Sequence, residues 1–196
     1  MNKFTSRIRL ALVGVLVFAL IAITSKVSLS QTPITYAKAQ ISGPGITGTL
    51  RLGQNPVLVW VNLDLQGDTT ILTPGLHGIH IHQTASCEEP GFTSAGGHFD
   101  PGPYGNSTPV YENHPYHTGD LPNIEIDESG KGRLKTVTTR FSISEGPLSI
   151  FDSDGSAIIV HQLPDLLKAG GTAAEAGGGR LACGVIEPDL STGWHY

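Results

Sequence analysis

Most of the eight histidines in this chain belong to one ordered series that also contains a carboxylate. The series runs His80, His82, His98, His117, Asp120 and His161. Side chains on a strand alternate between its two faces, so histidines at i and i+2, such as His80 and His82, project from the same face. Imidazole is a common ligand for copper and zinc, and a carboxylate three residues after a histidine adds the oxygen donor that zinc also accepts. The spacing therefore indicates a metal-binding site.

The segments that must position this site predict an all-β domain. Glycine occurs 25 times and proline 13 times, between short runs that alternate or are continuously apolar, and no long helical pattern is evident. Strands are expected at Ile34–Ile41, Thr47–Leu52, Val57–Leu65, Leu76–His82, Ile124–Asp127, Gly132–Thr138, Ala157–His161 and Leu181–Ile186. Two long loops, Gln83–Pro122 and Gln162–Gly179, interrupt these strands, and loops of this length are usually functional.

Length and charge narrow the class of protein further. The 196 residues are enough for one domain with a substantial core. The formal net charge is −5, and no block of basic residues occurs. Because phosphate binding needs clustered Lys and Arg, this composition argues against a nucleic acid partner.

The first 30 residues have the pattern of a signal peptide. Lys3, Arg7 and Arg9 precede an apolar stretch, Leu10–Ile23, which small and polar residues follow. The stretch is shorter than the roughly 20 residues that a membrane span needs, although an uncleaved anchor is the alternative. We therefore expect a signal peptide at 1–30, a mature domain at 31–196 after cleavage between Ser30 and Gln31, and export to a periplasm, a lumen or the extracellular space. No stable membrane association is expected after cleavage.

The chain has two cysteines, Cys87 and Cys183. In an oxidising compartment they are expected to form a disulfide, and two buried free thiols are the alternative.

Five segments, taken in order, resemble the copper/zinc superoxide dismutase family in its exported, bacterial-type form. They are Gly75–His82, Ser94–Pro101, His117–Leu121, Ile159–His161 and Gly179–Ile186. The resemblance spans about Ile34 to Ile186 and is more specific than any single pair of histidines. It implies an eight-stranded antiparallel Greek-key β-barrel or sandwich with two long functional loops.

The resemblance also implies which residues bind metal. His80, His82, His98 and His161 match the copper ligands, and His98 would also bridge to zinc. His117 and Asp120 match two further zinc ligands. Asn106 occupies the position where the family has its remaining zinc histidine, and His114 is the only nearby substitute. Either His114 completes the zinc site, or it is a solvated loop residue and the zinc site is three-coordinate, completed by water, or empty.

The implied activity is superoxide dismutation. Copper would alternate between Cu(II) and Cu(I) while two superoxide anions become oxygen and hydrogen peroxide, and zinc would have a structural and electrostatic role. Arg180 would hold the anion, His98 would carry a proton, and Asp165 would link a copper histidine to a zinc histidine. The loop Gln162–Gly179 has Lys168 as its only cation, so steering of the substrate by this loop is expected to be weak.

Two other functions stay open at this point. One is a copper-only dismutase, which is favoured if His114 does not bind zinc. The other is a non-catalytic metal-binding or structural domain on the same fold. His77 is expected to make structural hydrogen bonds, and His195 lies in a polar tail. A homodimer is compatible with the sequence, but no residue pattern identifies its interface.

Overall fold

The computed structural model describes residues 35–102, 117–168 and 172–191 of the chain. The strands are β1 (Tyr36–Gly43), β2 (Ile46–Gln54), β3 (Val59–Gly67), β4 (Gly75–His77), β5 (Ile79–His82), β6 (Ile124–Ile126), β7 (Lys131–Thr138), β8 (Ala157–His161), β9 (Arg180–Val185) and β10 (Glu187–Pro188). Within the described ranges the only helix is the three-residue 3-10 turn η1 (Thr93–Ala95), and no helix there is long and apolar enough to cross a membrane. The predicted all-β class is confirmed.

The long strands follow the alternation that the sequence predicts. In β1, Ala37, Ala39 and Ile41 are buried, whereas the residues between them lie nearer the solvent. Leu50 and Leu52 in β2, and the alternate residues of β3, face the same core. A strand with one apolar side buries that side against the interior and leaves the other side to water. This period of two accounts for the barrel core without any helix.

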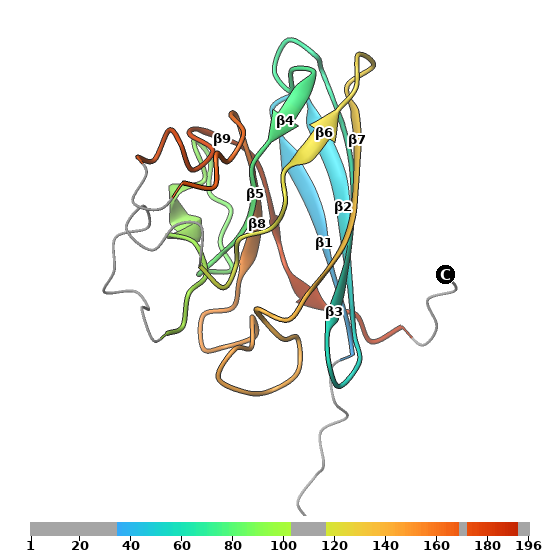
Figure 1. The fold of residues 1–196 in the computed structure, drawn as a ribbon, viewed down its shortest axis with the longest axis vertical. Coiled ribbons are helices and arrows are strands. Elements are labelled where there is room, and N and C mark those ends of the chain that lie inside the picture. The colour runs from blue at the N-terminus through green and yellow to red at the C-terminus, as the bar shows by residue number, and fades with distance from the viewer. Residues whose placement is uncertain (1–34, 103–116, 169–171, 192–196) are drawn as a thin grey trace, which may run out of the picture. The chain divides into compact units, whose positions relative to one another are not determined.

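Sheet pairing produces a nearly closed antiparallel barrel. The strand order is β4-β6-β7-β3-β2-β1-β9-β8-β5, and β10 pairs with β1 beside this path. The two ends of the path, β4 and β5, are consecutive in the chain and are separated only by Gly78. Figure 1 shows them as one green run that passes from one side of the barrel to the other. If β4 and β5 are counted as one interrupted strand and the two-residue β10 is set apart, the described residues contain the expected eight strands.

The long loops lie against the outer side of β5 and β8. Figure 1 shows the green loop that carries η1 on the same side of β5 as the red loop that precedes β9. A disulfide between Cys87 and Cys183 joins the first of these loops to β9, with a Cα–Cα distance of 5.7 Å. The predicted disulfide is therefore confirmed, and the alternative of two free thiols is wrong.

Candidate metal centre

Strand β5 presents two histidines on its outer side. Ile79 and Ile81 of this strand point into the barrel core, so His80 and His82 must point away from it. Both histidines are nevertheless fully buried, because the long loops cover the outer side of the strand. His161 ends the neighbouring strand β8, where a register irregularity follows Val160. The first three histidines of the site thus come from two adjacent strands of the barrel wall.

Two loop segments bring the other candidate ligands against β5. His98 forms a β-bridge with His82, and Asp120 forms one with His80. Gly119 directly precedes Asp120. A Cβ on Gly119 would lie only 2.3 Å from the carbonyl oxygen of Ile81, the strand residue between His80 and His82. Only glycine therefore lets the turn that carries Asp120 come this close to the strand.

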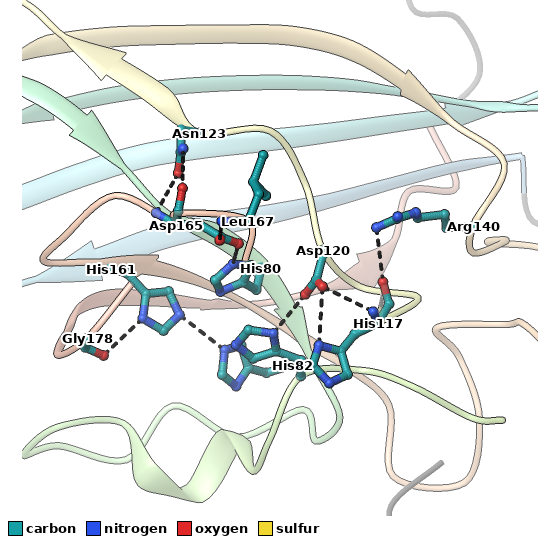
Figure 2. Close-up of polar contacts among 11 residues, drawn as sticks. His80, His82, His117, Asp120, Asn123, Arg140, His161, Asp165, Leu167 and Gly178 are labelled. Atoms are coloured by element: carbon teal, nitrogen blue, oxygen red, sulfur yellow. Dashed lines mark hydrogen bonds and ion pairs between the residues drawn. The ribbon is translucent and has the colours of Figure 1, made fainter. Parts of the chain in front are cut away.

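Four imidazoles converge in the first ligand group. One ring nitrogen from each of His80, His82, His98 and His161 lies within 4.8 Å of the others. His82 and His161 each place Nδ1 near a carbonyl oxygen, that of Gly96 at 3.0 Å and that of Gly178 at 3.2 Å. A carbonyl oxygen only accepts hydrogen bonds, so both Nδ1 atoms carry the proton and both Nε2 atoms present a lone pair. These two Nε2 atoms are 3.4 Å apart, which suits two ligands that face one metal ion (Figure 2).

A second group joins His98, His117 and Asp120. The two carboxylate oxygens of Asp120 divide between the histidines: Oδ1 lies 2.7 Å from Nδ1 of His98, and Oδ2 lies 3.2 Å from Nδ1 of His117. All three residues are buried. His98 belongs to both groups, so its imidazole lies between a site of four nitrogens and a site that includes an oxygen. The second donor set matches the nitrogen and oxygen ligands that zinc accepts.

The protonation states of these groups also suit metal binding. Burial lowers the pKa of His98 to about 3, and the neighbouring His80 adds to that effect. Burial likewise lowers the pKa values of His82 and His161 well below the ordinary value. Burial alone would raise the pKa of Asp120, but hydrogen bonds from His117 and His98 outweigh it and hold that pKa far below its usual range. Neutral imidazoles and an ionised carboxylate are the forms that coordinate metal ions.

Asp165 orients His80 from behind. Its Oδ2 accepts a hydrogen bond from Nε2 of His80 at 2.9 Å, so Nδ1 is the nitrogen that His80 can direct to a metal. Asn123 binds the backbone of Asp165 twice, through Nδ2 to the carbonyl oxygen and through Oδ1 to the amide, each at 2.9 Å (Figure 2). The sequence pointed to Asp165, but nothing in the pattern around Asn123 marked it.

Arg180 and His82 donate hydrogen bonds to the same backbone carbonyl oxygen, that of Gly96, and this contact places Arg180 beside the four-imidazole group. Its Nη2 donates to the carbonyl oxygen of Gly96 at 2.6 Å, and its Nη1 donates to that of Phe92 at 2.7 Å. The guanidinium is about half buried, and burial lowers its pKa. Arg180 opens β9, and the disulfide of Cys183 holds this strand to the loop that supplies both carbonyls.

Arg140 is a further residue at the site that the sequence did not reveal. It follows β7, and its Nη1 donates to the carbonyl oxygen of His117 at 3.3 Å (Figure 2). A single arginine after a strand has no distinctive spacing, so its contact with the turn of His117 is evident only in three dimensions.

The remaining residues that the sequence analysis named are not part of the two ligand groups that the described residues form. His77 is buried, and its ring nitrogens lie 2.8 Å from the carbonyl oxygens of His161 and Thr73, which confirms the predicted structural hydrogen bonds. Lys168 pairs with Glu175 at 2.8 Å. His114, Asn106 and His195 lie outside the described residues, so His114 stays a prediction.

Comparisons with known sequences and with solved structures both find copper/zinc superoxide dismutases or proteins similar to them. Residues 46–186 match the copper/zinc superoxide dismutase family. The Cu-Zn superoxide dismutase of Deinococcus radiodurans is 36% identical over 152 residues, covering 72% of this chain and 78% of the relative. Superoxide dismutase (Cu-Zn) 2 of Aquifex aeolicus is 32% identical over 175 residues, 88% of this chain and 96% of the relative. A crystal structure described as a SOD-like protein from Bacillus subtilis superposes with a TM-score of 0.62 at 29% identity, covering 75% of this chain and 95% of that one.

Proposed function

Because the chain belongs to the copper/zinc superoxide dismutase family, we propose that it converts two superoxide anions to oxygen and hydrogen peroxide. The observation that carries this proposal is the shared position of His98, which belongs both to a group of four buried imidazoles and to a group with a carboxylate. Such a pair of sites suits one redox-active ion and one that is not redox active.

Each metal has a proposed set of ligands in this chain. Copper would be held by His80, His82, His98 and His161. Zinc would be held by His98, His117 and Asp120, with His114 as the proposed fourth ligand. When bound, copper supplies a one-electron couple between Cu(II) and Cu(I), and zinc supplies positive charge without redox chemistry.

Two residues around the metals would act on the substrate: one would bind the superoxide anion and the other would hold a proton. Arg180 would attract and orient superoxide, because a half-buried cation acts on a nearby anion more strongly than a fully solvated one. Its two hydrogen bonds to backbone carbonyls hold the guanidinium in place. His98 would hold a proton at Nε2 whenever that nitrogen does not bind copper, because its Nδ1, which lies 2.7 Å from Oδ1 of Asp120, would be the nitrogen that binds zinc.

The test is metal analysis combined with an assay of superoxide dismutation. Protein loaded with copper and zinc should bind one of each and be active, and His82→Ala should lose copper and activity together while it retains zinc. Full activity with copper alone would favour a copper-only dismutase. Stoichiometric copper without activity would contradict the proposal and favour a non-catalytic metal-binding protein on this fold.

We also propose that the protein is exported. The pattern of residues 1–30 supports this, and a disulfide persists more readily in oxidising compartments than in the cytosol. Mass determination of the native protein should find a chain that begins at Gln31. An intact N-terminus on protein from the cytosol would contradict this localisation.

A further inference from the structure

Residues 172–178, just before β9, have the hydrogen bonds of a single turn of helix. The amide of Ala176 donates to the carbonyl oxygen of Thr172 at 3.1 Å, and the amide of Gly178 donates to that of Ala173 at 2.9 Å. Gly177 and Gly178 have positive φ angles of 99° and 68°, as glycines that end helices do. One turn by itself is unfavourable, because it fixes several residues for few hydrogen bonds. The turn therefore depends on side chains that hold it.

Thr172 and Glu175 form a capping box at the start of this turn. Oε2 of Glu175 accepts hydrogen bonds from the amide and the hydroxyl of Thr172, at 2.9 Å and 3.2 Å. In return, the amide of Glu175 donates to Oγ1 of Thr172 at 3.4 Å. This reciprocal pattern satisfies backbone groups that the first turn of a helix leaves unpaired.

The same carboxylate also pairs with a cation. Its Oε1 accepts a hydrogen bond from Nζ of Lys168 at 2.8 Å. Hydrogen bonds from Lys168 and Thr172 lower the pKa of Glu175 to about 2, so the carboxylate is ionised over the neutral range. Glu175 thus joins the residue before the turn to the first residue of the turn.

The end of the turn supports His161 in two ways. The carbonyl oxygen of Gly178 accepts a hydrogen bond from Nδ1 of His161 at 3.2 Å (Figure 2). Gly177 lies against the ring of the same histidine, and a Cβ on Gly177 would be only 2.8 Å from Cβ and Cγ of His161. A shift of either glycine would therefore change the direction in which Nε2 of His161 points.

The turn also touches the residue that orients a second histidine. Ala176 forms an isolated β-bridge with Asp165, whose carboxylate accepts the hydrogen bond from His80. Asn123 holds the backbone of Asp165 as well, through two hydrogen bonds. Because Asp165 has this further support, an opened turn should disturb His161 more than His80.

We propose that Glu175 is a positioning residue for His161, acting through the capping box and the turn that ends at Gly178. The inference rests on the proposed function, in which His161 is a copper ligand. The capping box should matter more than the ion pair, because the side chains of Lys168 and Glu175 are both partly exposed and such pairs contribute little. Glu175→Gln keeps an oxygen for the amide of Thr172, whereas Glu175→Ala removes it, so the two variants separate the cap from the charge.

The test uses metal-free protein with isotope-labelled histidine. NMR would measure how fast the Nδ1 protons of His161 and His82 exchange with solvent. In Glu175→Ala the proton of His161 should exchange roughly fivefold faster, the change expected when one helix cap is lost. His82 is the internal control, because its Nδ1 donates to the carbonyl oxygen of Gly96 in the other loop and should be unaffected. Glu175→Gln and Lys168→Met should stay within about twofold of the unmodified protein.

Copper binding gives a second measurement on the same variants. Chelator competition should show an affinity up to about fivefold lower in Glu175→Ala, because His161 is in the binding orientation for a smaller fraction of the time. Glu175→Gln should restore the affinity. An effect in Glu175→Gln as large as in Glu175→Ala would assign the role to the charge and overturn the capping box.

Equal exchange at His161 in Glu175→Ala and in the unmodified protein would overturn the proposal. A parallel increase at His82 would also overturn it, because the fold would then have loosened as a whole. The exchange measurement needs neither metal nor turnover. Copper-loaded protein without activity would therefore contradict the proposed function and leave the positioning of His161 by Glu175 intact.

Discussion

Asp165 and His80 form a hydrogen-bonded pair at 2.9 Å in which neither side chain is exposed. The carboxylate determines which nitrogen of His80 carries the proton and therefore which one can bind a metal. Asn123 and the amide of Leu167 hold Asp165 in turn, so the orientation of His80 depends on a chain of contacts that starts outside the ligand set.

Asp165→Asn should weaken metal binding by about 10- to 100-fold, because the amide has lost the charge that favours the Nε2–H form of His80. Competition titration with a chelator would measure this. Asp152→Asn, at an exposed position, is the control and should bind metal like the unmodified protein. Unchanged affinity in Asp165→Asn would show that backbone packing alone orients His80.

Arg140→Gln should lower zinc affinity more than copper affinity. Arg140 donates to the carbonyl oxygen of His117, which belongs to the carboxylate-containing group and not to the group of four imidazoles. Removing the cation would loosen the turn that carries His117 and Asp120. Zinc and copper dissociation measured on the same sample would separate the effects, and Arg140→Lys should recover part of the zinc affinity. A parallel loss of both metals would contradict this positioning role.

His114→Ala should lose zinc while it largely retains copper, if His114 supplies the remaining zinc ligand. The four copper imidazoles come from other positions, so partial activity should persist. His117→Ala is the matched comparison and should lose zinc in either case. If His114→Ala keeps full zinc affinity, His114 is only a loop residue and another group or water completes the site.

Reduction of the disulfide, or Cys87→Ser with Cys183→Ser, should lower the free energy of unfolding. The bond closes a loop with a sequence separation of 96 residues, for which the chain-entropy estimate is about 4 to 5 kcal/mol. The loop that supplies Gly96 should also loosen, so affinity for small anions near Arg180 should fall. Urea unfolding under oxidising and reducing conditions measures the first effect. Equal stability under both conditions would contradict the prediction.

Metal-free protein should become less stable as the pH falls below about 6.5. In the unfolded chain His98 titrates near 6.5, whereas in the folded protein its pKa is lowered to about 3, chiefly by burial. Between these values the unfolded chain binds the extra proton, so the free energy of unfolding decreases with falling pH, by up to about 1.4 kcal/mol per unit for each such group. Urea unfolding of chelator-treated protein at several pH values would show this slope. His98→Gln should reduce the slope, and an unchanged slope in that variant would contradict the assignment to His98.

Local patterns in the sequence were sufficient for much of the fold and part of the site. Alternation placed the strands within a few residues of their observed bounds, because a period of two follows from strand geometry alone. The same rule put His80 and His82 on one face. The two cysteines could only pair with each other, so their partner needed no structural information.

The tertiary structure decided which distant residues meet. His98 meets His161, and the turn of His117 meets His98, because the long loops lie over the outer side of β5 and β8, and loop paths leave no periodic signal. Asn123 and Arg140 act through contacts with backbone atoms, which any sequence possesses. The strand register likewise places Tyr36 and Trp60 on either side of Gly53, although the three residues come from three different strands. Register across separate strands depends on packing and turn geometry over the whole sheet, so no local pattern could determine it.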